Sequence, residues 1–223
     1  MSFPGFDPSF FKFLKALKAN NNREWFNDHK DTYIKDVETP AREFVQAFQP
    51  KLKTISPRFV ADPRRLGGSM FRIYRDTRFS PNKAPYKTYI GLRFWHDKKE
   101  IDSRPIFYLH LEPGRLFGGG GVYHPDPVTL RKIRLTMVER PKEWEAVITS
   151  GVTVTGETLQ RVPVGFAKDH PFADDLKRKG HVVMTPFTMA DAHSPDFLEQ
   201  YTDACRKMTP LMKFLTSALE LRW

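Results

Sequence analysis

Before Pro57, apolar side chains recur with the period of an α-helix. The first apolar stripe consists of Phe10, Phe13, Leu14 and Leu17, at positions i, i+3, i+4 and i+7. This spacing places the side chains on one buried face of a helix. Asp7-Pro8 and Thr39-Pro40 each combine a capping residue with a proline, which is typical of a helix start. The pattern predicts about three helices in this part of the chain.

Between Ser69 and Val122 the period changes to two, as half-buried antiparallel strands require. The apolar positions of the first three predicted strands are Phe71, Ile73, Ile90, Leu92, Phe94, Phe107, Leu109 and Leu111. The alternate positions are Arg72, Tyr74, Arg93, Trp95, Tyr108, His110 and Glu112. We expect a meander of about four strands whose apolar face packs on the helices and whose other face is polar. A polar, proline-containing turn is expected to join the first two strands.

After Asp126-Pro127 the helical period returns. The next predicted elements are strands at 152–155 and 181–187 and a helix at 171–179 between them. A long helix is predicted from Ser194-Pro195 to the end of the chain, and Thr209-Pro210 either kinks or restarts it. Helices, then a sheet, then helices define an α+β fold: a single domain over residues 1–223, with a central antiparallel sheet flanked by N-terminal and C-terminal helices.

Composition and charge narrow the class of protein. Hydrophobic residues make up 40% of the chain and include 19 Phe, enough for an ordered core. The single cysteine, Cys205, excludes an intramolecular disulfide and a cysteine-rich zinc site. No segment approaches the ~18 apolar residues of a membrane span, and the N-terminus lacks a signal-peptide pattern, so we expect a cytoplasmic protein outside the membrane. A formal net charge of +10 favours anionic partners.

Positive charge is concentrated between Arg64 and Lys87. The basic residues there are Arg64, Arg65, Arg72, Arg75, Arg78, Lys83 and Lys87, against the one acid Asp76. Guanidinium groups bind phosphate and carboxylate oxygens in bidentate geometry, and Pro81 and Pro85 restrict the turn that carries them. We therefore predict a site for a small anionic or phosphorylated ligand. Its predicted residues are Arg72, Tyr74, Arg75, Arg78, Lys83, Tyr86, Lys87, Arg93 and Trp95. The alternative is that the arginines pair with the protein's own carboxylates.

His110 and Glu112 stand two residues apart on a predicted strand, so both project from its polar face. A His and a carboxylate beside cations can carry out general acid–base chemistry, and these two residues are the candidate catalytic pair. A hydrogen-bonded pair on a half-exposed sheet is the alternative. The form H-x-E also occurs in zinc deaminases, but their P-C-x-x-C partner needs two cysteines. We predict no metal site and no cofactor.

The run Gly118–Gly121 follows a predicted strand and precedes the helix that Asp126 caps. Backbone N–H groups there could cradle an anion. The alternative is a bulged or edge strand where another backbone comes close. The run is not a P-loop, because no G-K-[ST] follows it.

The motif R-I-Y-R-D-T-R-F-S-P-N-K-A-P-Y-K-T-Y-I-G at Arg72–Gly91 resembles the signature of an uncharacterised bacterial and fungal family, the conserved hypothetical proteins grouped as domain of unknown function 2461. Tyr108–Pro113 with Gly118–Gly121, and Gly156–Pro171, resemble two further blocks of that family. The resemblance spans nearly the whole chain. It implies one domain and a cytosolic setting, and it assigns no activity, cofactor or catalytic residue.

The residues leave three interpretations open. The leading one is a pocket for a small anionic ligand, and the second is a nucleic-acid-binding module on the same basic and aromatic face. The third is a structural or interaction protein whose arginines bind only its own carboxylates. Converging cations in a concave site favour the small ligand, whereas a basic stripe reaching Arg64, Arg65, Lys98 and Lys99 favours a polymer. The sequence leaves the oligomeric state open.

Overall fold

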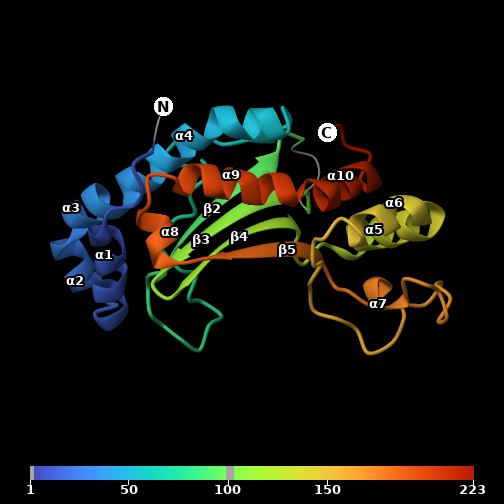
Figure 1. Ribbon diagram of the computed structural model, residues 1–223. Coiled ribbons are helices and arrows are strands. Elements are labelled where there is room, and N and C mark those ends of the chain that lie inside the picture. The colour runs from blue at the N-terminus through green and yellow to red at the C-terminus, as the bar shows by residue number, and fades with distance from the viewer. Residues whose placement is uncertain (1–2, 99–102) are drawn as a thin grey trace.

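Five strands form one antiparallel sheet within residues 3–98 and 103–223, the part of the chain that this computed structural model describes. The strands follow one another in the order β1-β2-β3-β4-β5 (Figure 1). They are β1 Phe59–Val60, β2 Ile90–His96, β3 Ile106–Glu112, β4 Arg115–Val122 and β5 His181–Phe187. The α+β fold with a central antiparallel sheet is thus confirmed.

Helices precede the sheet, as the apolar periodicity predicts. They are α1 Pro8–Ala19, α2 Arg23–Asp28, α3 Lys30–Tyr33, the π-helical turn η1 Ile34–Glu38, and α4 Thr39–Ile55. The Asp7 side chain accepts a hydrogen bond from the Ser9 N–H at 2.8 Å and caps α1. Pro40 lies in the first turn of α4, directly after η1, from which the helical backbone continues without a break.

The C-terminal helices are α5 Pro127–Glu139, α6 Pro141–Ile148, α7 Ala173–Leu176, α8 Met189–His193, α9 Phe197–Lys207 and α10 Thr209–Ala218. Pro210 restarts the chain as α10 rather than kinking one long helix. The helix predicted at 171–179 is reduced to the short α7. Of the strand predicted at 152–155, only a single bridge from Thr155 to Val182 exists.

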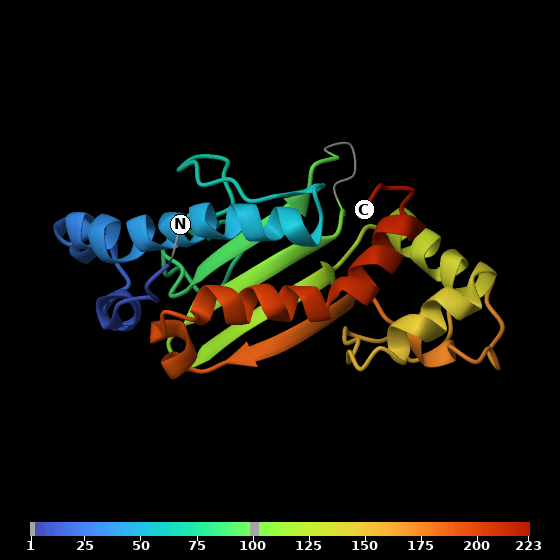
Figure 2. The same ribbon diagram turned by 45° about the horizontal axis from the view of Figure 1, so that its top comes forward.

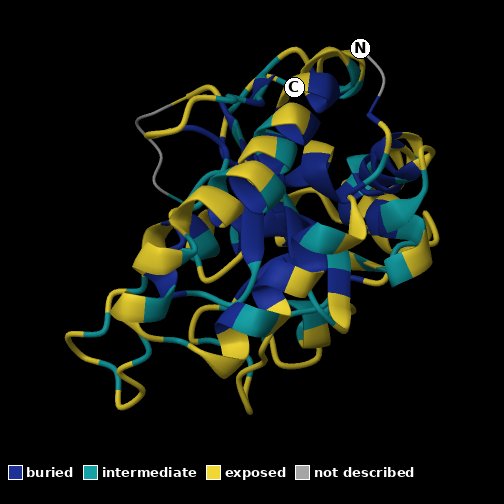
Figure 3. Ribbon diagram, turned by 90° about the vertical axis from the view of Figure 1, so that its left-hand side faces the viewer, coloured by how far each residue is buried: buried dark blue, intermediate teal, exposed yellow. Residues whose placement is uncertain are grey.

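The long helices α4, α9 and α10 cover one face of the sheet, while α1–α3 and α5–α7 lie at its two ends (Figures 1 and 2). The covered face carries Ile90, Leu92, Phe94, Phe107, Leu109 and Leu111, each at most 1% exposed. The buried residues of the sheet and of the inner helix faces form one continuous core (Figure 3). Burial of this face is the main contribution to the stability of the fold.

The strand predicted to begin at Ser69 is not formed, so this prediction is wrong. Residues 69–74 make only isolated bridges, Met70 to Leu92 and Tyr74 to Tyr86. Phe71 is half-buried rather than buried, because its ring lies on the opposite face of the sheet, 6.3 Å from the Tyr108 ring. An extended loop packed on a sheet shows the same two-residue alternation as a strand. The edge strand that pairs with β2 is instead β1.

The glycine run lies in β4, which pairs with β3 on one side and β5 on the other. Its N–H groups therefore belong to a sheet interior, and the edge-strand interpretation is wrong. The close backbone approach is confirmed at Gly121, where φ is +142° and a Cβ would lie 2.1 Å from the His181 carbonyl oxygen. On the covered face, a Cβ on Gly118 would lie 3.1 Å from the Tyr201 ring, so small residues let α9 approach the sheet.

Candidate functional site

A cleft of about 700 Å³ lies on the sheet face opposite α4 and α9. It is formed by the end of α1, the segment between β1 and β2, which in part hangs below the sheet in Figure 1, and the hairpin of β3 and β4. Its lining residues are Lys18, Asn21, Arg75, Asp76, Asn82, Ala84, Tyr86, Lys87, Thr88, Tyr89, His110, Glu112 and Arg115. The cleft thus brings together the predicted Arg75, Tyr86 and Lys87 with both candidate catalytic residues.

A chain of hydrogen bonds along β3 ends at the cleft. His110 Nε2 lies 3.2 Å from Glu112 Oε2, and His110 Nδ1 lies 3.1 Å from the Tyr108 hydroxyl. Because an ionised carboxylate only accepts, Nε2–H donates to Glu112 and the Tyr108 O–H donates to Nδ1. Successive polar positions of one strand face therefore form a continuous chain from Tyr108 to Glu112.

The imidazole of His110 lies between two aromatic rings. The Tyr89 ring centroid is 4.5 Å from that of His110, and the Phe117 ring of β4 is stacked on the His110 ring with a centroid distance of 4.9 Å. Burial lowers the pKa of His110, and the hydrogen bond to Glu112 opposes part of this effect. Burial also raises the pKa of Tyr108, which therefore stays protonated. At neutral pH the imidazole of His110 in this hydrogen-bond chain is therefore neutral.

Local hydrogen bonds fix the loop that forms one wall of the cleft. Arg75 Nη1 donates to the Ala84 carbonyl at 3.1 Å, and Nη2 lies 3.4 Å from the Ser80 hydroxyl. Asn21, just beyond α1, exchanges two 3.0 Å hydrogen bonds with the Tyr86 backbone, one in each direction. Arg75 therefore ties the start of this loop to residues in its middle and near its end, and Asn21 ties the end of the loop to the end of α1.

Positive charge dominates the cleft lining. Its cations are Lys18, Arg75, Lys87 and Arg115, and its carboxylates are Asp76 and Glu112. The Arg78 guanidinium makes hydrogen bonds to both Asp76 oxygens, at 3.0 and 2.7 Å, and lowers the pKa of that carboxyl. Burial lowers the pKa of Lys87, and nearby Arg72 adds to the effect, so an anion in the cleft would relieve an unfavourable environment for this ammonium.

The other predicted site residues lie outside the cleft. Arg72 and Tyr74 line a second, smaller cavity, and Arg72 is exposed. Arg78 pairs with Asp76, and Lys83 Nζ donates to the Thr77 carbonyl, so both interact within their own loop.

Arg93 and Trp95 lie further along β2. The Arg93 guanidinium lies over the Trp95 ring, 5.4 Å from its centroid, and over the Phe71 ring at 4.9 Å. These two aromatic rings already contact a cation, which leaves less of their surface for stacking.

Sequence reasoning missed Lys18, Asn21, Tyr89 and Arg115. Arg115 was predictable, because a tight β3–β4 turn pairs it with Glu112 and so places it on the same sheet face. Lys18 and Asn21 reach the cleft only because α1 packs beside the loop. Asn21 and Tyr86, which are hydrogen-bonded there, lie 65 positions apart in the sequence. No local pattern carries that information.

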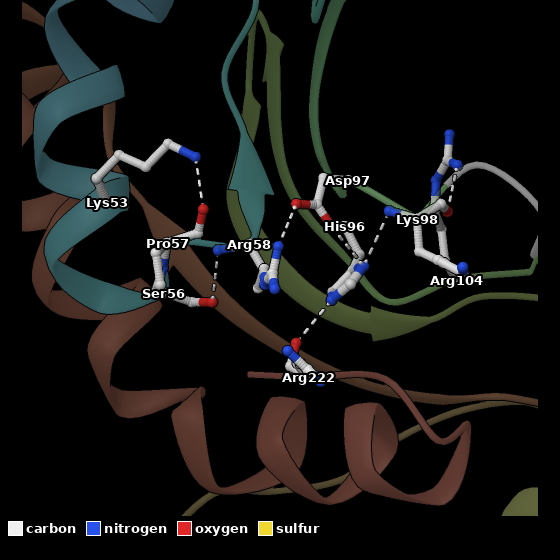
Figure 4. A network of polar contacts seen from close by, with 9 residues as sticks. All are labelled: Lys53, Ser56, Pro57, Arg58, His96, Asp97, Lys98, Arg104 and Arg222. Carbon is white, nitrogen blue, oxygen red and sulfur yellow. Dashed lines mark hydrogen bonds and ion pairs between the residues drawn. The ribbon is translucent and has the colours of Figure 1, made fainter.

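A separate polar network lies at the other end of β2 (Figure 4). His96 Nε2 lies 2.8 Å from the Arg222 carbonyl, and the Lys98 N–H donates to His96 Nδ1 at 3.1 Å. This network ties the C-terminal segment to the sheet. Of the residues that would extend a basic stripe, Arg64 and Arg65 pair with Asp62 and Glu38, and Lys99 lies outside the described residues.

Two further observations concern metal ions and membrane-spanning helices. Within residues 3–98 and 103–223, no group of three or more His, Cys, Asp or Glu side chains is placed to hold a metal ion. None of the helices in that part of the chain is long and apolar enough to span a membrane.

The fold and the cleft define an α+β protein with a cationic cleft beside an antiparallel sheet. A family model described as "Conserved hypothetical protein (DUF2461)" matches residues 9–214. The chain belongs to this family, as the motif at Arg72–Gly91 indicates. No curated protein matches it.

Proposed function

We propose that the protein binds a small anionic or phosphorylated ligand in the cleft. The observation that carries the proposal is the convergence of Lys18, Arg75, Lys87 and Arg115 on one concave site beside the His110–Glu112 pair. Cations from three separate elements surround a space of about 700 Å³, within the ~300–1,000 Å³ range of small-molecule sites. Charge-assisted hydrogen bonds to such an anion are about twice as strong as neutral ones.

Glu112 indicates what else the ligand carries. A carboxylate in a cationic cleft repels an anion unless it faces a hydrogen-bond donor of the same ligand. Glu112 is oriented by His110 and lines the cleft, so it suits a hydroxyl or amino group placed away from the anionic end. Tyr89 offers a ring face for the body of the ligand. A phosphorylated molecule with free hydroxyl groups fits this arrangement.

Isothermal titration calorimetry with inorganic phosphate tests the proposal. The wild type should bind phosphate, and Arg115→Gln should weaken binding about tenfold or more, because a charged hydrogen bond contributes about 1.5–3 kcal/mol. Lys142→Gln, an exposed lysine of α6 outside the cleft, is the matched control for loss of one positive charge. Equal weakening by both variants would mean that phosphate binding depends only on net charge, and it would contradict a specific binding site in the cleft.

The nucleic-acid alternative predicts a different response. Affinity for a single-stranded oligonucleotide would fall steeply with salt, because each neutralised phosphate releases counterions. It would also require Arg93 and Trp95, which lie outside the cleft. Anisotropy titrations at several salt concentrations with Arg93→Gln and Arg115→Gln separate the two functions.

A further inference from the structure

A second cavity of about 250 Å³ lies beside the cleft and uses other residues. Tyr74 lines this cavity, while Tyr86, whose ring lies 5.4 Å from that of Tyr74, lines the cleft. The Phe26 ring, stacked on Tyr86 at 4.1 Å, also faces the second cavity. The two spaces therefore share an aromatic wall.

The walls of this cavity are aromatic and apolar, and one end is polar. Phe26, Tyr33 and Tyr74 supply ring surfaces. At the polar end, Glu38 is only 8% exposed, and its Oε1 lies 2.8 Å from Arg65 Nε. Glu38 is the last residue of the π-helical turn η1, a feature frequent at functional sites. Burial raises the pKa of the neighbouring Tyr33, so its hydroxyl stays protonated.

The polar end retains unused hydrogen-bonding capacity. A carboxylate offers about four acceptor positions and a guanidinium five donors. The Glu38–Arg65 contact occupies a small part of both. Side by side they present an acceptor and a donor, which complements a molecule with adjacent N–H and C=O groups.

The mouth of the cavity is cationic. Lys30 and Arg72 are both exposed there, and their side chains make no hydrogen bond or ion pair in the described part of the chain. Leu66, 77% exposed, and Tyr74, 57% exposed, add apolar surface beside them. An entering ring would cover that apolar surface, and an attached anion would meet both cations.

We propose that this cavity binds the base of a purine nucleoside monophosphate of the guanine or hypoxanthine type. The base stacks on the aromatic walls, its N–H groups donate to Glu38, and its carbonyl accepts from Arg65. At about 250 Å³ the cavity lies below the ~300–1,000 Å³ range of ligand pockets, so it admits one ring system. The ribose phosphate then lies at the mouth against Lys30 and Arg72. Adenine presents a ring nitrogen that is an acceptor at the corresponding position, so it would repel the Glu38 carboxylate instead of donating to it.

Calorimetry with GMP, guanosine and AMP tests the proposal. GMP should bind at least tenfold more tightly than AMP, and guanosine should bind more weakly than GMP because it lacks the phosphate. Glu38→Gln, which replaces one acceptor oxygen by a donor, should weaken GMP binding at least tenfold and remove the preference over AMP. Lys30→Gln should weaken GMP but not guanosine, whereas Lys35→Gln on the outer surface of η1 is the control and should change neither.

This inference does not depend on anion binding in the cleft, and the two tests give results that can be told apart. Arg115→Gln weakens phosphate binding in the cleft but should leave guanosine binding unchanged. Absence of GMP binding at millimolar concentration, equal affinity for GMP and AMP, or loss of guanosine binding in Arg115→Gln would overturn the inference. The base preference and the Lys30→Gln result do not depend on Glu38→Gln folding, which circular dichroism checks.

Discussion

His110 Nε2 lies 3.2 Å from Glu112 Oε2, and this pair couples the polar sheet face to the cationic cleft. The neutral imidazole donates to Glu112 while accepting from Tyr108. Besides Glu112, its charged or titratable neighbours are Arg115, Tyr108 and Tyr89. A proton added to His110 would give the cleft one more cation without changing the fold of the strand.

Sulfate affinity should therefore rise as pH falls from 7 to 5. His110 has a pKa lowered by burial, so it takes up its proton below its ordinary value of 6.5, and a bound dianion favours that uptake. We expect an increase of about threefold or more, since an added charge within reach of the anion contributes at least that much. Calorimetric titrations at four pH values measure it. His110→Asn should show a flat profile, and a wild-type affinity that falls with acidity would refute this role.

Arg75→Lys should weaken phosphate binding about tenfold despite conserving the charge. The planar guanidinium reaches Ala84 and Ser80 at once, and an ammonium cannot hold both. The loop should then become more mobile, and faster tryptic cleavage at Arg78 or Lys83 would report it. Unchanged affinity with faster cleavage would mean that the shape of the loop is irrelevant to the ligand.

Gly118→Ala should destabilise the fold by about 1–3 kcal/mol, the usual cost of overpacking a rigid core. Its Cβ would lie 3.1 Å from the ring of Tyr201, which is fully buried and packed against Phe48. Gly119→Ala is the adjacent control, because its Cβ would meet no atom closer than 3.5 Å on the other face. Urea unfolding of both variants gives the two values, and equal losses would contradict the packing argument.

Stability should fall as pH drops from about 6.5 to 4 because of His181. Burial lowers its pKa to about 4, so the unfolded chain binds the proton more readily than the folded one. This stabilisation is complete above the unfolded value of 6.5 and is lost towards pH 4, with a span on the order of 3 kcal/mol. Urea midpoints across this range should flatten in His181→Asn. The exposed His124→Gln is the control and should retain the wild-type slope.

The fold was largely predictable because its core obeys simple periods. The α1 stripe from Phe10 to Leu17 and the alternation along β2 and β3 each match one face of a regular element. The error at Ser69–Tyr74 has a physical cause: an extended loop packed on a sheet alternates as a strand does. Only the partner of a strand, which depends on tertiary structure, separates the two cases.

The lining of the cleft was predictable in part. Local charge density identified Arg75 and Lys87, and strand alternation identified His110 and Glu112. The same alternation placed Arg72 and Tyr74 with them because it assumed a regular strand, whereas both residues line the second cavity. Lys18 and Asn21 required knowledge of where α1 packs, which no spacing within the chain supplies.

A crystal soaked in selenate tests the central claim most directly. Selenate is a tetrahedral dianion with an anomalous signal, so its position can be read without a prior choice of ligand. We expect its strongest peak in the cleft, within hydrogen-bonding distance of Arg115 and at least one of Lys18, Arg75 and Lys87, and we expect Arg115→Gln crystals to lose it. Peaks confined to other surface cations, with none in the cleft, would contradict the proposal that this cleft binds anions.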